Sequence, residues 1–269
     1  MMDREKIKEI MQSQGILPQS KFGQNFLCDE DIIRSIVRLC GIREGDTVIE
    51  IGPGLGSITV PISELPVRFY SYEIDKGLAE YLKSSVTNVT VINKDFLKVD
   101  ISESKKPDVV VSNIPYYIMT DIMKKLFGEY SSARRMVFMV EDEAVARIDC
   151  GPCSKQYGPL AILCSLYGSY NYEFKVPYTA FVPQPRTTSA VISFERKDSA
   201  DILCDDFVKF LNACFSMRRK MLKKNLAGIA SADAVSTAFL KHGINENARA
   251  EELTPEEFAE LYTYFIGHL

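Results

Sequence analysis

The sequence predicts an α/β fold, with a mostly parallel, Rossmann-like sheet of seven strands that carries helices on both faces, followed by a small all-helical part. Short β-branched apolar runs alternate with helical segments along most of the chain, a pattern typical of buried parallel strands. A glycine-rich turn joins the first of these runs to the helix after it. Beyond Ser199 the apolar residues follow helical spacing only, which indicates a second domain.

The overall composition is that of a globular protein. Of the 269 residues, 46% are apolar and 25% are charged, values that exclude extended disorder and coiled-coil arrays. No apolar run approaches the roughly 18 residues needed to cross a bilayer, and the charged start has no signal-peptide core, so we expect a cytoplasmic protein. Seven scattered cysteines fit reduced thiols. Only two histidines are present, which argues against a histidine-based metal site or a Ser-His-Asp triad, so we expect no metal.

The elements are expected in a regular order. After a charged helical start, a helix is predicted over 29–40, where apolar residues share one face and Gly41 ends it. The predicted parallel strands are 47–51, 68–74, 89–93, 109–113 and 135–140. The predicted helices between them are 56–64, 76–84 and 120–127. Two more strand-like runs, 172–178 and 189–195, predict an antiparallel, hairpin-like finish to the sheet.

The last 70 or so residues are predicted to be helical. Apolar residues over 205–215 fall at helical spacing. The segment Thr254-Pro255-Glu256-Glu257 is a capping box with proline at the first helical position, and it opens a final helix. We therefore expect two domains, 1–197 and 198–269.

Charge is segregated along the chain, although the net charge is only −4. Six lysines or arginines and no acidic residue lie within 209–224, whereas six glutamates and one arginine lie within 245–260. A local basic surface can bind phosphates on a protein that is acidic overall. The alternative is a solvated helix face without a ligand. The basic residues predicted to share one helical face are Arg219, Lys220, Lys223 and Lys224.

A glycine-rich turn follows the first predicted strand. The segment 50–56 (EIGPGLG) lets the backbone turn sharply and approach a ligand closely. At the carboxyl end of a parallel strand, this is where a nucleotide-like cofactor binds. Glu73 ends the second strand, 17 residues after Gly56, where a carboxylate can accept hydrogen bonds from two ribose hydroxyls. The alternative is a tight βα turn without a ligand.

A further acidic residue, Asp95, ends the third strand. The turn has the spacing G-x-G-x-G rather than the G-x-G-x-x-G of many NAD and FAD sites. Carboxylates after successive strands suit a cofactor that has adenine and amine donors and no pyrophosphate. We therefore predict S-adenosylmethionine, with Asp95 bonded to the adenine amino group and Phe96 beside the ring. The alternative for Asp95 is a helix cap or a turn residue.

The segment Asn113-Ile114-Pro115-Tyr116 ends the fourth strand on the same side of the sheet. An exocyclic amine on a base is a poor nucleophile because its lone pair is delocalised into the ring. The Asn113 side-chain oxygen and the Ile114 carbonyl offer acceptors for its two N–H groups and can aim the lone pair at a methyl sulfonium. No strong base is needed before attack, and Tyr116 offers a flat face for a flipped base. The alternative is a strand end with a proline stop.

Several segments, in chain order, resemble the rRNA adenine N6-dimethyltransferases. They cover nearly the whole chain, and their combination is highly specific although each alone is not. They are 21–27 (KFGQNFL), 50–56 (EIGPGLG), 113–116 (NIPY), 181–185 (FVPQP), 189–191 (SAV), 215–220 (FSMRRK) and 249–253 (RAEEL).

Two branches of this family compete. The KsgA-type enzymes dimethylate two adjacent adenines in the 3′-terminal hairpin loop of small-subunit rRNA, and the Erm-type enzymes act on one adenine of large-subunit rRNA. Residues 218–220 and 151–158 (GPCSKQYG) resemble the KsgA type, which we favour. Gln184 stands where the family commonly has proline, and Arg186-Thr187-Thr188 departs from the usual Lys-Val-Asp, which affects the predicted target loop.

The resemblance implies a class I S-adenosylmethionine-dependent methyltransferase domain over 1–197 and a helical RNA-binding domain over 198–269. It implies a monomeric enzyme with a role in small-subunit biogenesis. Its catalytic residues would be Asn113, Pro115, Tyr116 and Phe181, with Phe181 stacked on the target adenine or, alternatively, only a core residue. The cofactor-binding residues would be Gln24, Asn25, Leu27, Gly52, Gly54, Gly56, Glu73, Ile74, Asp95, Phe96 and Asn113. The RNA-binding residues would be Arg218, Arg219, Lys220, Lys223 and Lys224.

Two interpretations from other classes stay open at this point. One is a non-catalytic ribosome assembly factor that keeps the cofactor fold, against which the presence of the predicted site residues argues. The other is an NAD-dependent oxidoreductase, which the Asn-Ile-Pro-Tyr segment and the scarcity of histidine disfavour.

Overall fold

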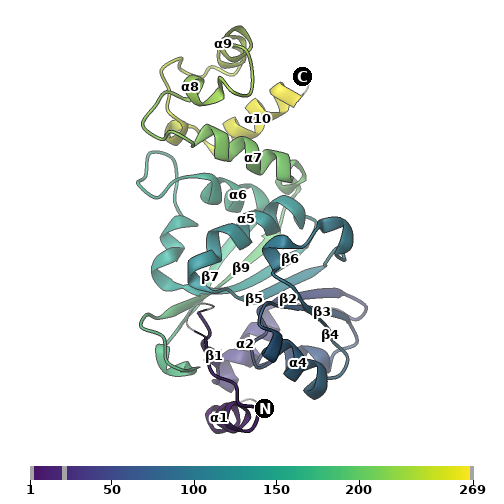
Figure 1. Cartoon of the computed structure of the whole chain (residues 1–269). Helices are drawn as coiled ribbons and strands as arrows, with labels where there is room; N and C mark the ends of the chain where they lie inside the picture. The colour runs from purple at the N-terminus through teal and green to yellow at the C-terminus, as the bar shows by residue number, and fades with distance from the viewer. Residues whose placement is uncertain (1–2, 20–22, 267–269) are drawn as a thin grey trace. The chain divides into compact units, whose positions relative to one another are not determined.

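The structure is a computed structural model that describes residues 3–19 and 23–266 of the chain (Figure 1). The chain forms two compact units. The first unit comprises Met1–Ile122, Ser132–Val145 and Ser169–Arg196. The second comprises Met123–Ser131, Ala146–Gly168 and Lys197–Leu269, so two earlier segments join the region after residue 197. The assignment of a catalytic and an RNA-binding domain stays a proposal.

The first unit is built on a mixed seven-stranded sheet with the order β4-β3-β2-β5-β6-β9-β7. The pairs β4/β3, β3/β2, β2/β5 and β5/β6 are parallel, and β9 runs antiparallel to β6. The mostly parallel sheet is therefore as predicted. Its strands are β2 (Thr47–Ile51), β3 (Arg68–Glu73), β4 (Thr90–Asn93), β5 (Val109–Asn113), β6 (Arg135–Glu141), β7 (Gly168–Val176) and β9 (Ser189–Arg196).

The last two strands, β9 and β7, are neighbours at one end of the sheet, as the predicted finish requires, but the bounds of β7 and the chain between the two strands differ from the prediction. β7 begins at Gly168 and ends at Val176, because Pro177 and the 3-10 turn η6 (Tyr178–Ala180) follow it. β8 (Phe181–Val182) then leaves the sheet and pairs with β1 (Phe26–Leu27) in a separate two-stranded sheet. This pairing was not predicted, because two-residue strands carry no readable period.

Alternate strand residues bury one face of the sheet. Val109 and Val111 of β5 are fully buried and pack in one cluster with Ile33 and Ile36 of the helix before β2. The period of two places such residues on one face, and each buried side chain of this size stabilises the fold by about 1.5–3 kcal/mol. Figure 1 shows α2 and α4 on the same side of the sheet. The helices of this unit include α1 (Arg4–Ser13), α2 (Glu30–Leu39), α3 (Thr59–Ser63) and α4 (Lys76–Ser85), and α5 (Met119–Glu129) begins in it.

The helix after the glycine turn is shorter than the predicted 56–64. Gly56 has φ +90°, which is outside the helical region, so the helical backbone begins only after it, although its carbonyl accepts a hydrogen bond from the Val60 N–H at 2.9 Å. By contrast, α2 begins where expected, because the Asp29 carboxylate accepts hydrogen bonds from the N–H groups of Asp31 and Ile32.

The second unit is helical. Its remaining helices are α6 (Pro159–Tyr167), α7 (Asp205–Cys214), α8 (Leu222–Leu226), α9 (Ala232–Lys241) and α10 (Pro255–Ile266). The predicted capping box is confirmed, since the Thr254 N–H donates to Glu257 at 2.7 Å and the Glu257 N–H donates to the Thr254 hydroxyl at 3.2 Å. α6 was not predicted, because apolar side chains cover nearly all of its circumference, with Ser165 as an exposed exception, and leave no clear amphipathic period. Within 3–19 and 23–266, the structure has no helix with both the length and the apolarity to span a membrane.

Candidate active site at the carboxyl end of the sheet

A pocket of about 1090 Å³, including its open mouth, lies where β2, β3, β4 and β5 end. We call it the sheet-end pocket. All of its lining residues belong to the first unit. Those used below include Gln24, Asn25, Leu27, Glu50, Gly52, Gly54, Ser57, Glu73, Ile74, Asp95, Phe96, Asn113, Ile114, Pro115, Tyr117 and Phe181. Nearly all of the predicted cofactor-binding residues therefore meet in one place.

The glycine turn forms one wall of this pocket. Gly54 has φ +59°, and a Cβ there would lie 3.0 Å from the Phe26 ring, so a larger residue would be strained and crowded. Gly56 behaves differently from the prediction. It does not line the pocket, and its missing Cβ would lie 2.9 Å from Leu82. Gly56 is thus required for packing of the turn against α4, not for a direct approach to a ligand.

Glu73 ends β3 beside this turn. Its carboxylate accepts hydrogen bonds from the backbone N–H groups of Gly54 (3.1 Å) and Asp75 (2.8 Å). Only 4% of the residue is exposed, and this burial raises the pKa of Glu73 to about 7 despite those hydrogen bonds. Both carboxylate oxygens are thereby fixed at the pocket wall.

A second buried carboxylate, Glu50, was not assigned a role from the sequence. It is 2% exposed, accepts hydrogen bonds from the hydroxyls of Thr59 (2.7 Å) and Ser71 (3.3 Å), and lines the same pocket. Burial raises the pKa of Glu50 to about 7. The signal was available, because a glutamate inside a strand that is otherwise buried and mostly apolar needs an explanation.

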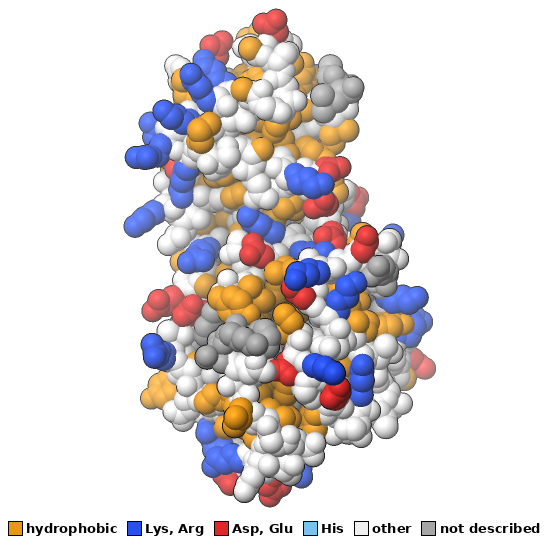
Figure 2. All heavy atoms as spheres, in the orientation of Figure 1, with side chains coloured by type: hydrophobic (Ala, Val, Ile, Leu, Met, Phe, Trp, Pro, Cys, Tyr) orange, Lys and Arg blue, Asp and Glu red, His pale blue; other side chains and the backbone are white. Residues whose placement is uncertain are grey.

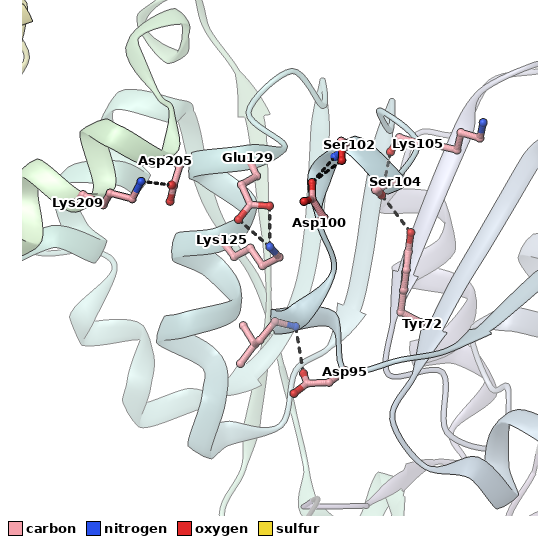
Figure 3. A network of polar contacts seen from close by, with 11 residues as sticks. Tyr72, Asp95, Asp100, Ser102, Ser104, Lys105, Lys125, Glu129, Asp205 and Lys209 are labelled. Carbon is pink, nitrogen blue, oxygen red and sulfur yellow. Dashed lines mark hydrogen bonds and ion pairs between the residues drawn. The ribbon is translucent and has the colours of Figure 1, made fainter.

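Asp95 has the geometry of a cap as well as a place in the pocket. Its carboxylate accepts a hydrogen bond from the Leu97 N–H at 3.1 Å and so caps the 3-10 helix η2 (Phe96–Lys98), as Figure 3 shows. Phe96 is 4% exposed, and its ring packs edge-on against Tyr72 at 5.3 Å between centroids. Asp95 is therefore a helix cap, which was the alternative interpretation, and it also lies on the pocket wall.

The N-terminal segment covers another side of the pocket. The β1/β8 pairing sets Leu27 opposite Phe181, and the Ser57 hydroxyl donates to the Leu27 carbonyl at 2.6 Å. These bonds bring residues from three distant parts of the chain to one wall. Phe181 lines the pocket but is only 1% exposed and belongs to the hydrophobic cluster under the sheet. Phe181 is therefore both a core residue, which was the alternative interpretation, and a residue of the pocket wall. Residues 21 and 22 of the first motif lie outside the described residues.

Asn113 lies at the end of β5, half-buried at the pocket wall. Its side-chain nitrogen donates to the Asn25 carbonyl at 3.4 Å, which turns the carboxamide oxygen into the available acceptor. The Ser112 hydroxyl donates to the Ile51 carbonyl at 2.7 Å and holds β5 against the glycine turn. Pro115 also lines the pocket.

Of the two tyrosines after Pro115, the structure describes the side chain of only one, Tyr117. Tyr116 opens the 3-10 helix η4 (Tyr116–Ile118), but its side chain lies outside the described part of the structure, so its predicted stacking stays a prediction. Tyr117 lines the pocket and is 60% exposed. It was not predicted as a site residue, although a second aromatic residue beside Tyr116 was a visible signal.

Similarity to known proteins identifies the family. The family model for "Ribosomal RNA adenine dimethylase" matches residues 17–266. The chain belongs to this ribosomal RNA adenine dimethylase family. It is 35% identical over 274 residues to the ribosomal RNA small subunit methyltransferase A of Enterococcus faecalis, covering 95% of this chain and 93% of the relative. It is 36% identical to the protein of that name from Streptococcus pneumoniae, covering 94% of each.

Two solved structures have the same fold as this chain. A dimethyladenosine transferase from Plasmodium falciparum matches with a TM-score of 0.69 at 22% identity, covering 90% of this chain and 98% of that one. The 23S rRNA methyltransferase ErmE matches with a TM-score of 0.60 at 24% identity, covering 90% of this chain and all of that one. The predicted Rossmann-like methyltransferase fold is therefore confirmed, and so is the prediction of an rRNA adenine dimethyltransferase at the level of the family.

The basic residues of the helical unit do not share one helix, which corrects the prediction. α7 ends at Cys214 and α8 starts at Leu222, so Arg219 and Lys220 lie in the turn between them. The chain is extended at Met221, which forms an isolated β-bridge with Arg249, and this pairing interrupts the helix. Lys and Arg side chains nevertheless gather on one side of the part that contains α8 (Figure 2). The exposed members are Arg219, Lys220 and Lys224.

Arg218 and Lys223 of this group have acidic partners. The Arg218 guanidinium donates to the Glu251 carboxylate (2.7 Å) and to the backbone carbonyls of Ser154 (2.9 Å) and Lys155 (2.6 Å). Lys223 lies 3.7 Å from Glu246. Arg218 therefore holds the 151–158 loop in the helical unit, a role that the sequence did not reveal.

Proposed function

We propose that this chain transfers methyl groups from S-adenosylmethionine to the N6 amines of two adjacent adenines in the 3′-terminal hairpin loop of small-subunit (16S) rRNA, two methyl groups per adenine. Family membership and the names of the curated relatives support the reaction and the subunit. The observation that carries the proposal is the convergence of the glycine turn, Glu73, Asp95 and Asn113 on one pocket.

The residues present fit the cofactor. A fixed, buried carboxylate, Glu73, lies at the pocket wall beside a turn that admits no side chain at Gly54. Glu73 would accept hydrogen bonds from the ribose hydroxyls and Asp95 would accept one from the adenine amino group. Ile74, Phe96 and Leu27 supply apolar surface. S-adenosylmethionine supplies, when bound, a methyl group on a positively charged sulfur.

The chain's own contribution to the reaction is to hold the target amine. The Asn113 oxygen and the Ile114 carbonyl would accept the two N–H groups of adenine N6 and aim its lone pair at the methyl carbon. The pocket-lining residues include no histidine, which fits an amine that loses its proton only after it has become cationic. Phe181 and Tyr116 would stack on the two faces of the flipped base. The rate enhancement from these residues would come from the position and orientation in which they hold the amine.

The small subunit is favoured over the large one as the substrate. The curated relatives that carry the small-subunit name are 32–36% identical over nearly the whole chain, whereas ErmE is 24% identical. Exposed Arg219, Lys220 and Lys224 are proposed to contact RNA phosphates, while Arg218 would act by holding its loop. We further propose a monomer that acts in the cytoplasm during small-subunit biogenesis.

The direct test is to incubate the protein with undermethylated small subunits and labelled S-adenosylmethionine and to map the modified nucleotides. Two adjacent dimethylated adenines in the 3′-terminal hairpin are expected. Undermethylated large subunits serve as the matched substrate control. Label only in large-subunit rRNA would assign the Erm-type reaction, and cofactor-independent binding to small subunits without label would assign an assembly factor. Either result contradicts the proposal.

A further inference from the structure

Asp75 links two walls of the sheet-end pocket. It is 9% exposed and lies between β3 and α4, as the N-cap of α4. It bonds to residues more than 50 positions away in the sequence, at the N-terminal segment, and also to Glu73 on the pocket wall. Neither the family resemblance nor the sequence pattern assigned it a role.

The two carboxylate oxygens of Asp75 have separate tasks. Oδ1 accepts from the N–H groups of Gly77 (2.9 Å) and Leu78 (3.2 Å), which is ordinary N-capping of α4. Oδ2 accepts from the side-chain amides of Gln19 (2.6 Å) and Gln24 (3.2 Å). Only the second oxygen therefore connects α4 to the N-terminal segment.

Gln24 is fixed by this arrangement at both ends of its amide. Its Nε2 donates to Asp75, and its Oε1 accepts from the backbone N–H of Gln19 at 2.8 Å. The amide cannot turn over without losing both bonds. Residues 24–27, which line the pocket directly after this point, are thereby held against the body of the first unit.

The backbone of Asp75 acts on the opposite wall. Its N–H donates to one oxygen of Glu73 at 2.8 Å, while Gly54 donates to the other. One residue thus fixes the carboxylate proposed to bind the ribose and, through Gln24, the segment that contains Asn25 and Leu27. Asn25 in turn accepts from Asn113.

We propose that Asp75 is a positioning residue for the cofactor: its Oδ2 holds the N-terminal segment in the place where residues 24–27 complete the pocket around S-adenosylmethionine. This inference rests on the proposed function. Asp75 does not line the sheet-end pocket and acts through Gln24 and Glu73.

The two tasks of Asp75 can be separated by Asp75→Asn. Asparagine is as good an N-cap as aspartate, so its Oδ1 keeps the cap of α4, but its Nδ2 is a donor and cannot accept from the two glutamines. The dissociation constant for S-adenosylhomocysteine, measured by calorimetry on the full chain, is expected to rise about 10-fold. The thermal midpoint of the free protein is expected to change little.

Matched variants sharpen this test. Asp29→Asn makes the same change at the N-cap of α2, outside the pocket, and should leave the dissociation constant unchanged. The double variant Asp75→Asn/Gln24→Glu exchanges the donor and the acceptor, because the carboxylate introduced at position 24 accepts from the asparagine amide and still accepts from the Gln19 N–H. This exchange should recover most of the lost affinity, which a general loss of folding would not permit.

Each outcome decides between named alternatives. Unchanged affinity in Asp75→Asn overturns the inference, as does an affinity loss that the double variant fails to recover or that accompanies an equal loss of thermal stability. If the wild-type chain binds neither S-adenosylhomocysteine nor S-adenosylmethionine, the proposed function itself fails, and the inference fails with it. Wild-type binding with an unaffected Asp75→Asn leaves the proposed function standing.

Discussion

The carboxylate of Glu73 accepts a hydrogen bond from the backbone N–H of Gly54 at 3.1 Å, across 19 residues of sequence. This bond joins the ends of β3 and β2 at the point where the sheet-end pocket opens. It orders the glycine turn and the acidic residue as one unit. The pairing also explains why the turn and the acid, each a weak signal alone, are informative together.

Ligand binding should depend on the ionisation of Glu73. Burial raises the pKa of Glu73 to about 7, so below that pH one of its oxygens carries a proton and is no longer a pure acceptor for ribose hydroxyls. Affinity for S-adenosylhomocysteine is therefore expected to rise from pH 6 to pH 8, as measured by calorimetry. Glu73→Gln should bind weakly at every pH. A wild-type affinity that falls over this range would contradict the assignment.

Glu50 should lower the stability of the free protein at neutral and alkaline pH. Burial raises the pKa of Glu50 to about 7, above its unfolded value near 4.5, so its contribution to stability is present below pH 4.5 and is lost as the pH rises through 7. Glu50→Gln keeps an acceptor for Thr59 and Ser71 without the buried charge.

At pH 8 we expect the free energy of unfolding of Glu50→Gln to exceed that of wild type by about 1–3 kcal/mol. Near pH 4.5 the two free energies of unfolding should be equal. Denaturant unfolding of both proteins at the two pH values measures this difference. A variant that is less stable than wild type at pH 8 would show that the charge is compensated in the folded state.

Asn113→Ala should strongly reduce methyl transfer while the fold is kept. The substitution removes the oxygen proposed to hold adenine N6, and a loss of about 10²–10³-fold in turnover is expected, the size seen when one oriented polar group is removed. Label transfer to small subunits measures it, and circular dichroism with thermal unfolding reports the fold. Turnover close to wild type would remove Asn113 from its assigned role.

Lys223 and Lys224 should contribute to RNA binding through charge alone. Replacing both by alanine is expected to weaken binding of the small-subunit hairpin and to reduce the slope of log affinity against log salt by about 0.7–0.9 per lost phosphate contact. Because Lys223 already lies near Glu246, Lys224 should account for most of the change. Cofactor affinity should not change. The pair Lys6→Ala/Lys8→Ala, in α1, is the control, and an equal effect there would point to nonspecific attraction.

Arg218 should matter for stability before it matters for RNA. Arg218→Ala removes three hydrogen bonds that join the turn after α7 to Glu251 and to the 151–158 loop. We expect a loss of about 2 kcal/mol in the free energy of unfolding, with Arg218→Lys intermediate because lysine cannot form the fork. Denaturant unfolding measures the change. Weaker RNA binding with an unchanged free energy of unfolding would instead support the direct contact between Arg218 and RNA that the sequence predicted.

The pattern of apolar residues determined the sheet. Strand residues at 47–51 and 109–113 matched the structure in their bounds, because fully buried parallel strands leave continuous β-branched runs. The convergence of the predicted residues was also readable, because residues at the carboxyl ends of β2, β3, β4 and β5 meet at one edge when those strands are parallel. The sequence therefore determined, by itself, that Gly52, Glu73, Asp95 and Asn113 share a pocket.

Tertiary structure decided what depends on contacts between distant segments. Three features join residues that are far apart in sequence: the β1/β8 pairing, the Arg218 bonds and the network of Asp75. No local periodicity of the sequence predicts them. The helical face expected for Arg219 to Lys224 failed for the same reason, because a bridge from Met221 to Arg249 overrode local helix propensity. Local patterns fix strands and turns through short-range sterics and burial, whereas hydrogen bonds between distant segments exist only once the fold has brought them together.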